Sequence, residues 1–103
     1  MLFYHRYNGG HEKIGMHRDN EPEMDITAPM VSFSFGQERS FIFEHVDDDM
    51  KMENDLSKIY IELEHGSALI IHPPTNTKWY HGIPREFAKR GVRINLTFRK
   101  LLC

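Results

Sequence analysis

Residues 93–99 read Arg-Ile-Asn-Leu-Thr-Phe-Arg, and polar and apolar side chains alternate through all seven positions. Because successive side chains of a β-strand point to opposite faces, this period of two predicts a strand with one polar face. That face carries Arg93, Asn95, Thr97 and Arg99. An edge strand with one solvent-exposed face would show the same alternation. Two arginines around an amide and a hydroxyl also suit a small dicarboxylate, because a guanidinium binds carboxylates bidentately.

The rest of the chain favours the same kind of element. Seven further β-favouring stretches alternate with turn-forming residues, and one of them, Val-Ser-Phe-Ser-Phe at residues 31–35, again has a period of two. A short helical turn is expected at residues 84–89, and residues 46–58 are expected to form a long polar hairpin loop. The expected strands cover residues 2–7, 14–17, 30–35, 40–45, 59–63, 68–71, 78–83 and 92–101.

Many short strands at regular spacing predict an all-β fold. About eight strands with little helix match a double-stranded β-helix, the jelly roll that is also found in cupins. The length of 103 residues predicts a single domain that covers residues 1–103. Large aromatic side chains mostly fill cores, so we assign to the sheet interior the phenylalanines Phe33, Phe35, Phe41, Phe43 and Phe98.

The cysteine content and the apolar runs limit the function classes. The single cysteine, Cys103, excludes an intrachain disulfide, a zinc finger and an iron–sulfur cluster, and it fits a reducing compartment. No apolar run approaches the ~20 residues that span a bilayer, and the first residues lack the apolar core of a signal peptide. We therefore expect an intracellular protein without a membrane partner, nuclear in a eukaryote and otherwise cytoplasmic.

The charges are unevenly distributed along the chain, although the net charge is only −2. Residues 44–64 contain eight acidic and two basic residues, whereas residues 78–100 contain seven basic residues and one acidic residue. The basic segment could face a phosphate backbone. A solvated surface of mixed charge explains the same distribution.

A candidate metal site begins with the sequence His17-Arg18-Asp19. Residues i and i+2 of an extended chain project to the same face, so His17 and Asp19 can bind one ion together. His81, at the end of another predicted strand, is the candidate third ligand. Two histidines and one carboxylate with open positions are typical of non-haem Fe(II) oxygenases. The H-x-D pair alone is often coincidental, and the competing candidate ligands are His5, His11, His45, His65 and His72.

Taken together, these motifs resemble the AlkB family of oxidative nucleic-acid demethylases, and within it the second-homologue type that repairs DNA. The similarity runs almost from end to end of the chain. Its most specific element is the terminal Arg-x-Asn-Leu-Thr-Phe-Arg motif. The other matching segments are residues 5–7, 14–21, 29, 31–36, 65–69 and 74–81.

The resemblance implies an Fe(II) centre with 2-oxoglutarate and O2 as cosubstrates. The implied iron ligands and catalytic residues are His17, Asp19 and His81. The implied 2-oxoglutarate pocket contains Tyr7, Arg93, Asn95, Thr97 and Arg99, with Arg93 on the distal carboxylate. The implied contacts to a flipped base come from Asn20 and Glu21.

The activity implied by the resemblance is oxidative demethylation of alkylated bases in DNA alkylation repair. Decarboxylation of 2-oxoglutarate to succinate would be coupled to hydroxylation of an N-methyl group on adenine or cytosine, and the product would release formaldehyde. The expected partner is alkylated DNA, with RNA as an alternative. Two further alternatives are a cupin-like metal-binding module without oxygenase activity and a nucleic-acid-binding remnant.

The chain departs from the family's pattern at two places. His5-Arg6-Tyr7 stands where Asn-x-Tyr is usual, so His5 replaces an asparagine that helps to hold 2-oxoglutarate. The family's nucleotide-recognition lid comes from a segment upstream of the residues matched here. We therefore expect a monomeric catalytic core without this lid, which would take the missing recognition elements from an upstream segment or a partner.

Overall fold

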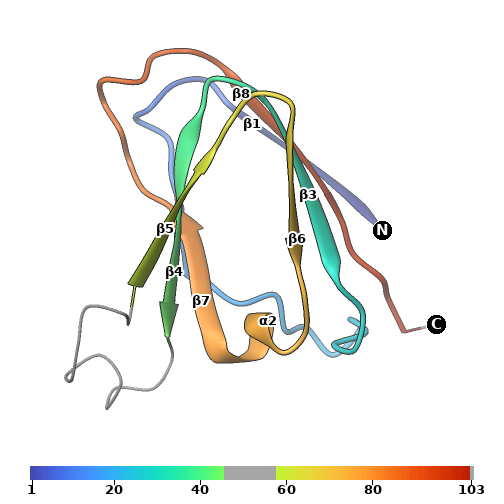
Figure 1. Cartoon of the computed structure of the whole chain (residues 1–103). Helices are drawn as coiled ribbons and strands as arrows, with labels where there is room; N and C mark the ends of the chain where they lie inside the picture. The colour runs from blue at the N-terminus through green and yellow to red at the C-terminus, as the bar shows by residue number, and fades with distance from the viewer. Residues whose placement is uncertain (46–57, 103) are drawn as a thin grey trace.

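Eight strands form two antiparallel sheets in the computed structural model of the chain, which describes residues 1–45 and 58–102 (Figure 1). The first sheet has the strand order β1 (Leu2–Tyr7), β8 (Arg93–Phe98), β3 (Met30–Gly36) and β6 (Ser67–Ile71). The second has the order β2 (Ile14–His17), β7 (Trp79–Ile83), β4 (Arg39–His45) and β5 (Lys58–Leu63). The predicted double-stranded β-helix with little helix is confirmed.

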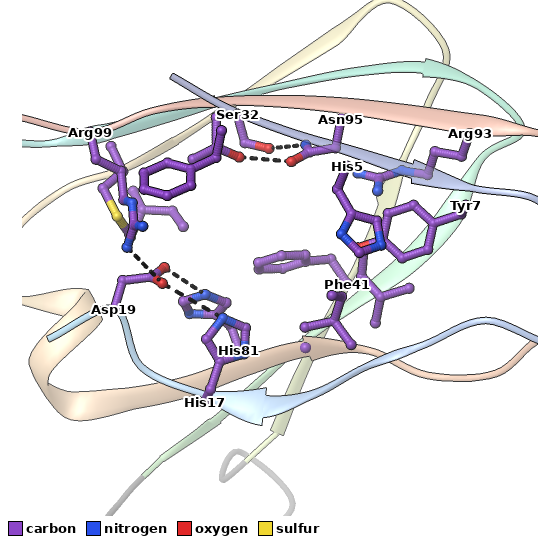
Figure 2. Close-up of a pocket in the computed structure, with 17 residues that line it drawn as sticks. His5, Tyr7, His17, Asp19, Ser32, Phe41, His81, Arg93, Asn95 and Arg99 are labelled. Carbon is purple, nitrogen blue, oxygen red and sulfur yellow. Dashed lines mark hydrogen bonds and ion pairs between the residues drawn. The ribbon is translucent and has the colours of Figure 1, made fainter. Parts of the chain in front are cut away.

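Strand β8 lies inside the first sheet, between β1 and β3. Its register places His5 opposite Asn95 and Tyr7 opposite Arg93 on the β1 side. On the other side, Ser34 of β3 stands opposite Asn95. Directly opposed residues share a face of the sheet, so the polar face of β8 is continued by polar residues of both neighbours. This face points toward the second sheet, and Figure 2 shows its side chains between the two layers.

The core forms where the inner faces of the two sheets meet. Its buried apolar side chains are Tyr7, Met24, Met30, Phe41, Phe43, Leu63, Ile71 and Ile83. Phe41 and Phe43 are therefore interior, as predicted. The assignment of Phe35 and Phe98 to the interior is wrong, since 39% and 45% of their surfaces are exposed. Phe33 shares their face and packs edge-on against Phe98.

The physical reason for that correction is the period of two. The polar residues of β3 and β8 occupy the inner face, so the phenylalanines of the same strands must point outward. A strand pattern shows which residues share a face, but not which face is buried. Here the side chains of the pocket, rather than the largest apolar ones, take the inward positions of the first sheet.

The helical turn lies elsewhere than expected. The structure has no helix at residues 84–89, and the short helix α2 is at Thr75–Lys78, directly before β7. The hairpin loop expected at residues 46–58 lies outside the described residues except for its last position, which begins β5. Within the described ranges, no helix is long and apolar enough to cross a membrane.

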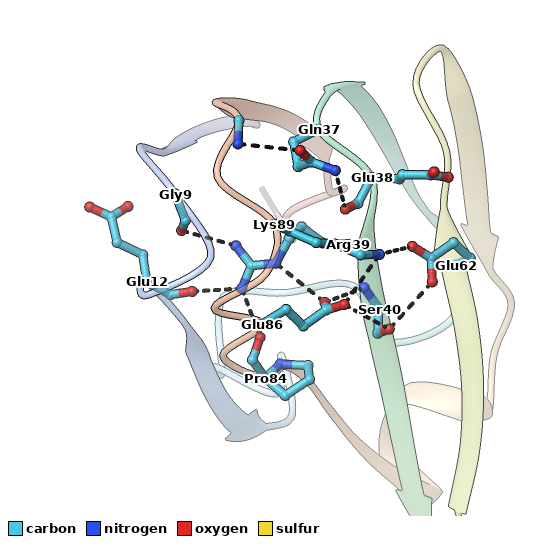
Figure 3. A network of polar contacts seen from close by, with 11 residues as sticks. Gly9, Glu12, Gln37, Glu38, Arg39, Ser40, Glu62, Pro84, Glu86 and Lys89 are labelled. Carbon is cyan, nitrogen blue, oxygen red and sulfur yellow. Dashed lines mark hydrogen bonds and ion pairs between the residues drawn. The ribbon is translucent and has the colours of Figure 1, made fainter.

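Residues 84–89 are instead held by a buried arginine of β4 (Figure 3). Arg39 is 1% exposed. Its guanidinium donates to the carbonyl oxygens of Gly9 at 3.2 Å, Glu12 at 2.7 Å and Pro84 at 2.7 Å, and it pairs with the Glu86 carboxylate at 3.3 Å. One side chain thus joins the loop after β1, the loop after β7 and the start of β4.

Glu86 is the anionic partner in this network. Its carboxylate also accepts from the Ser40 amide at 2.7 Å and pairs with Lys89 at 3.2 Å. Burial alone would raise the pKa of Glu86, but the Ser40 amide, Lys89 and Arg39 together hold the pKa below its ordinary value. The carboxylate therefore stabilises the fold in its charged form.

We predict that Glu86→Ala lowers the free energy of unfolding by about 2 kcal/mol near pH 7, because it leaves the Arg39 guanidinium buried without an anion. A lowered pKa gives stability that is present above the ordinary carboxyl pKa and is lost as pH falls through the folded-state value. The difference between wild type and variant, measured by urea denaturation, therefore shrinks in acid. Glu62→Ala, which removes a more exposed partner of Lys89, is the control and should cost below about 1 kcal/mol. Equal effects of the two variants would contradict this account.

Candidate active site

Three metal-binding side chains converge at one end of the space between the sheets (Figure 2). His17 ends β2 and stands directly opposite His81 of β7, and Asp19 follows two residues after His17. Their ligand atoms lie within 4.8 Å of one another. Asp19 Oδ2 lies 3.2 Å from His81 Nε2, and Asp19 Oδ1 lies 3.7 Å from His17 Nε2. The structure thus brings together the three residues that the sequence singled out.

The charge of Asp19 suits a cation. Burial alone would raise the pKa of Asp19, but the hydrogen bond and charge of His81, followed by the charges of Arg99 and His17, hold it below its ordinary value. The His17 ring Nδ1 lies 2.8 Å from the carbonyl oxygen of Gly15. When Nδ1 donates this bond, Nε2 keeps the lone pair that a metal needs. The donor set of two imidazoles and one carboxylate fits Fe(II).

Arg99 is part of this metal-binding end of the pocket. Its Nη1 atom is 3.0 Å from Asp19 Oδ1 and 3.4 Å from Glu21 Oε2, and its guanidinium lies 3.8 Å from the ring centroid of Phe3. The side chain lines the pocket, but two carboxylates already engage its charge. Of the two arginines that bracket the polar face of β8, Arg93 in the strand and Arg99 directly after it, Arg93 is therefore the one left to bind an anion.

A pocket of about 260 Å³ extends from the metal-binding end to Arg93, between the two sheets. Arg93 is 1% exposed, and its Nη2 atom donates to Ser34 Oγ at 2.9 Å. Its Nε and Nη1 atoms have no hydrogen-bond partner among the described residues. Burial lowers the pKa of Arg93, as expected for a cation removed from water. A buried guanidinium with two free donors is costly unless an anion pairs with it, so this end fits a carboxylate.

The wall between the two ends is a fixed polar surface. Thr97 Oγ1 donates to Asn95 Oδ1 at 2.7 Å, and the Asn95 amide nitrogen donates to the Ser32 hydroxyl and, at 3.2 Å, to the carbonyl oxygen of Phe33. These bonds fix the orientation of the Asn95 amide. Thr97 and Asn95 both line the pocket, so the structure places them where the sequence predicted.

Two residues of β1 complete the end around Arg93. Tyr7 is 3% exposed, and its ring lies 5.0 Å from the Arg93 guanidinium and 5.6 Å from that of Arg39. Burial raises the pKa of Tyr7, and the charge of Arg93 and its polar contact with the Tyr7 hydroxyl, followed by the charge of Arg39, partly offset this. His5 also lines the pocket, and its ring centroid is 4.2 Å from that of Tyr7. An imidazole thus lies beside Tyr7 in the lining of the same pocket as Arg93 (Figure 2).

The two residues expected to contact a substrate base lie outside the pocket lining. Glu21 pairs with Arg99, and 55% of its side chain is exposed. Asn20 is exposed as well. The sequence reasoning also missed polar residues that hold the site residues in place. Ser34 binds Arg93, and Asn76 binds the main chain of Asp19. Strand alternation separated Ser34 from Phe33 and Phe35, but the assignment of those phenylalanines to the interior turned Ser34 outward. Asn76 lies in the matching segment 74–81, where no role was assigned to it.

Comparison with known families agrees with this geometry. Residues 2–99 match the family model described as the 2OG-Fe(II) oxygenase superfamily. The chain belongs to this superfamily. Fe(II), 2-oxoglutarate and O2 are the metal and cosubstrates that membership implies, and the described residues that fit the ion are His17, Asp19 and His81.

Similar curated proteins support the resemblance to the AlkB family. DNA oxidative demethylase ALKBH2 of Mus musculus is 44% identical over 99% of this chain, and the Homo sapiens protein of that name is 42% identical. The alkB homolog 3 dioxygenase of Homo sapiens is 32% identical. The match covers 43% of the mouse ALKBH2 and 40% of the human one, so the chain spans about two fifths of these relatives.

Solved structures show the same fold. OsALKBH1 superposes with a TM-score of 0.67 at 27% identity, over 96% of this chain and 48% of that one. The cupin domain of Drosophila melanogaster CENP-C gives a TM-score of 0.62 at 17% identity, over 97% of this chain and 60% of that one. The second similarity concerns the jelly-roll fold alone.

We predict that Arg93→Leu weakens binding of 2-oxoglutarate at least about 30-fold, the equivalent of about 2 kcal/mol for a charge-assisted bond. The measurement is calorimetric titration of Mn(II)-loaded protein with 2-oxoglutarate. Arg90→Leu, at an exposed arginine of the preceding loop, is the matched control and should bind as wild type does. An unchanged affinity of Arg93→Leu for 2-oxoglutarate would show that Arg93 does not bind the cosubstrate carboxylate.

We predict a smaller effect at His5, because its ring lies at the exposed edge of the pocket. His5→Ala should weaken 2-oxoglutarate binding about fivefold, the equivalent of about 1 kcal/mol for one lost hydrogen bond. His5→Asn keeps a side-chain donor and should lie close to wild type in the same titration. If both variants match wild type, His5 makes no contact with the cosubstrate.

Proposed function

We propose that the protein is an Fe(II)- and 2-oxoglutarate-dependent dioxygenase that oxidatively demethylates alkylated bases in DNA. The observation that carries the proposal is the layout of one pocket. A two-histidine, one-carboxylate ligand set forms one end, and the free donors of a buried arginine face the other. A molecule with a metal-chelating end and a distal carboxylate, such as 2-oxoglutarate, matches both ends at once.

The chain's own groups have separate roles in this proposal. Iron held by His17, Asp19 and His81 would supply the oxidation, coupled to conversion of 2-oxoglutarate to succinate and CO2. Arg93 binds the distal carboxylate, and the buried Tyr7 ring packs beside its guanidinium. Arg99 holds the Asp19 carboxylate in place and keeps it ionised.

The substrate assignment draws on the relatives. Proteins named DNA oxidative demethylase match the chain at 42–44% identity across nearly its whole length. We propose N-methylated adenine or cytosine in DNA as the target, and formaldehyde as the product released when the base is demethylated. RNA with the same lesions is the alternative substrate. Parallel assays on methylated DNA and methylated RNA distinguish the two.

Pocket size bears on how a base is recognised. A pocket of about 260 Å³ lies below the roughly 300–1,000 Å³ typical of ligand sites. It has room for the cosubstrate, whereas an extruded base would sit at its open side and need stacking groups around it. We propose that the chain acts as a monomer and that a further segment or a partner supplies those groups.

The test is mass spectrometry of methylated oligonucleotides incubated with the protein, Fe(II), ascorbate and 2-oxoglutarate. We expect demethylated product and succinate, both lost by at least about 100-fold in His17→Ala and unaffected in His11→Ala, an exposed histidine outside the pocket. No succinate with or without DNA would overturn the dioxygenase assignment. Metal binding without a 2-oxoglutarate-dependent change in the visible spectrum would instead favour a cupin-like metal-binding module.

A further inference from the structure

Asp19 is held in a different way from the two histidines. Strand β2 ends at His17, so the hydrogen-bond ladder between β2 and β7 does not reach Asp19. The side chain of Asn76 binds its main chain instead. The Asp19 amide donates to Asn76 Oδ1 at 3.1 Å, and the Asn76 amide nitrogen donates to the Asp19 carbonyl oxygen. One carboxamide thus satisfies both main-chain groups of the residue, as a neighbouring strand would.

A second contact joins the same two segments. Arg18 Nη1 donates to the carbonyl oxygen of Thr77 at 2.9 Å. Asn76 and Thr77 belong to α2, and this short helix leads directly into β7, which carries His81. The segment that fixes the main chain of Asp19 therefore also begins the strand that carries another metal ligand.

Side-chain geometry connects the hydrogen bonds between Asn76 and the Asp19 main chain to the metal site. A single CH2 group separates the main chain of an aspartate from its carboxylate, and its first torsion angle has three staggered positions. Once the main chain is fixed, few positions of the carboxylate remain. The observed one faces both histidines, at 3.2 Å from His81 and 3.7 Å from His17. A main chain free to move would spread the carboxylate over other positions.

We propose that Asn76 is a positioning residue of the metal centre, which sets metal affinity by fixing the main chain of Asp19. The inference rests on the metal site of the proposed function, but not on the substrate or the cosubstrate. Residues that orient metal ligands typically change metal affinity 10–100-fold when they are replaced. Asn76 is half-buried and its own side chain is not one of the three ligands, and its side-chain hydrogen bonds go to the main chain of Asp19.

The test uses Co(II) as the probe, with no 2-oxoglutarate or DNA present. We measure the Kd for Co(II), the visible d–d spectrum of the loaded protein and the Tm of the metal-free protein. Thr77→Ala is the matched control, because its lost hydroxyl bonds only within the same turn, to Pro74, and the Thr77 carbonyl that Arg18 binds remains. We expect Asn76→Ala to weaken Co(II) binding about 10–100-fold and to alter the spectrum, in addition to any fall in metal-free Tm, whereas Thr77→Ala should bind Co(II) as wild type does.

The outcomes separate positioning from a merely structural contact. A lower metal-free Tm with unchanged Kd and spectrum overturns the inference, since Asn76 would then only join two loops. If Asn76→Ala does not fold, Asn76→Ser, which keeps one hydrogen-bonding group, decides by the same measurements. Wild-type protein that binds no Co(II) would overturn the proposed metal centre together with this inference. If wild type binds Co(II) and the Asn76 variants bind it with the same Kd, the inference about Asn76 is overturned and the proposed metal centre stands.

Discussion

A buried arginine with unused donors is the constraint on which the rest of the structure depends. The guanidinium of Arg93 is enclosed between two sheets, where an unpaired charge is expensive. The neighbouring residues do little to neutralise it, since Ser34 accepts one bond and Tyr7 offers an aromatic face. Arg39, the other buried arginine nearby, has Glu86 as its own partner. The fold thus neutralises one buried cation and leaves the other for a ligand.

The two ends of the pocket have opposite electrostatic character. Asp19 stays ionised at one end and gives the ligand set a negative charge, which Arg99 partly balances from outside the cluster. The other end is positive, and none of the described carboxylates forms an ion pair with Arg93. A metal ion and the distal carboxylate of a dicarboxylate can therefore each find a complementary end, and the fixed Asn95–Thr97 wall lines the pocket between these ends. Such preorganised charges cost no rearrangement when the ligands bind.

Sequence patterns predicted the strands and the shared face of His17 and Asp19, because period and spacing are properties of the local chain. His81 lies 62 residues after Asp19, and its place in the ligand set rested on its predicted strand and on the family resemblance. They placed Phe35 and Phe98 on the wrong side, since alternation does not show which face is buried. The ion pair between Arg99 and Asp19 joins residues 80 positions apart, and the hydrogen bonds between Asn76 and the Asp19 main chain join residues 57 positions apart. No local sequence rule predicts such contacts. The helix α2 was not predicted because its residues are typical of turns.

The ligand set also has a thermodynamic consequence for β2. This four-residue strand lies at the edge of its sheet, and its pairing with β7 is irregular between Ile14 and His17. An ion shared by His17 and His81 would cross-link the two strands at the point where the ladder ends. An ion present at 100 times its Kd adds about 2.7 kcal/mol to stability, a large share for a domain of this size. Iron would thus stabilise the pairing of β2 with β7 as well as take part in the reaction. Without iron, β2 would be the first strand to separate from its sheet.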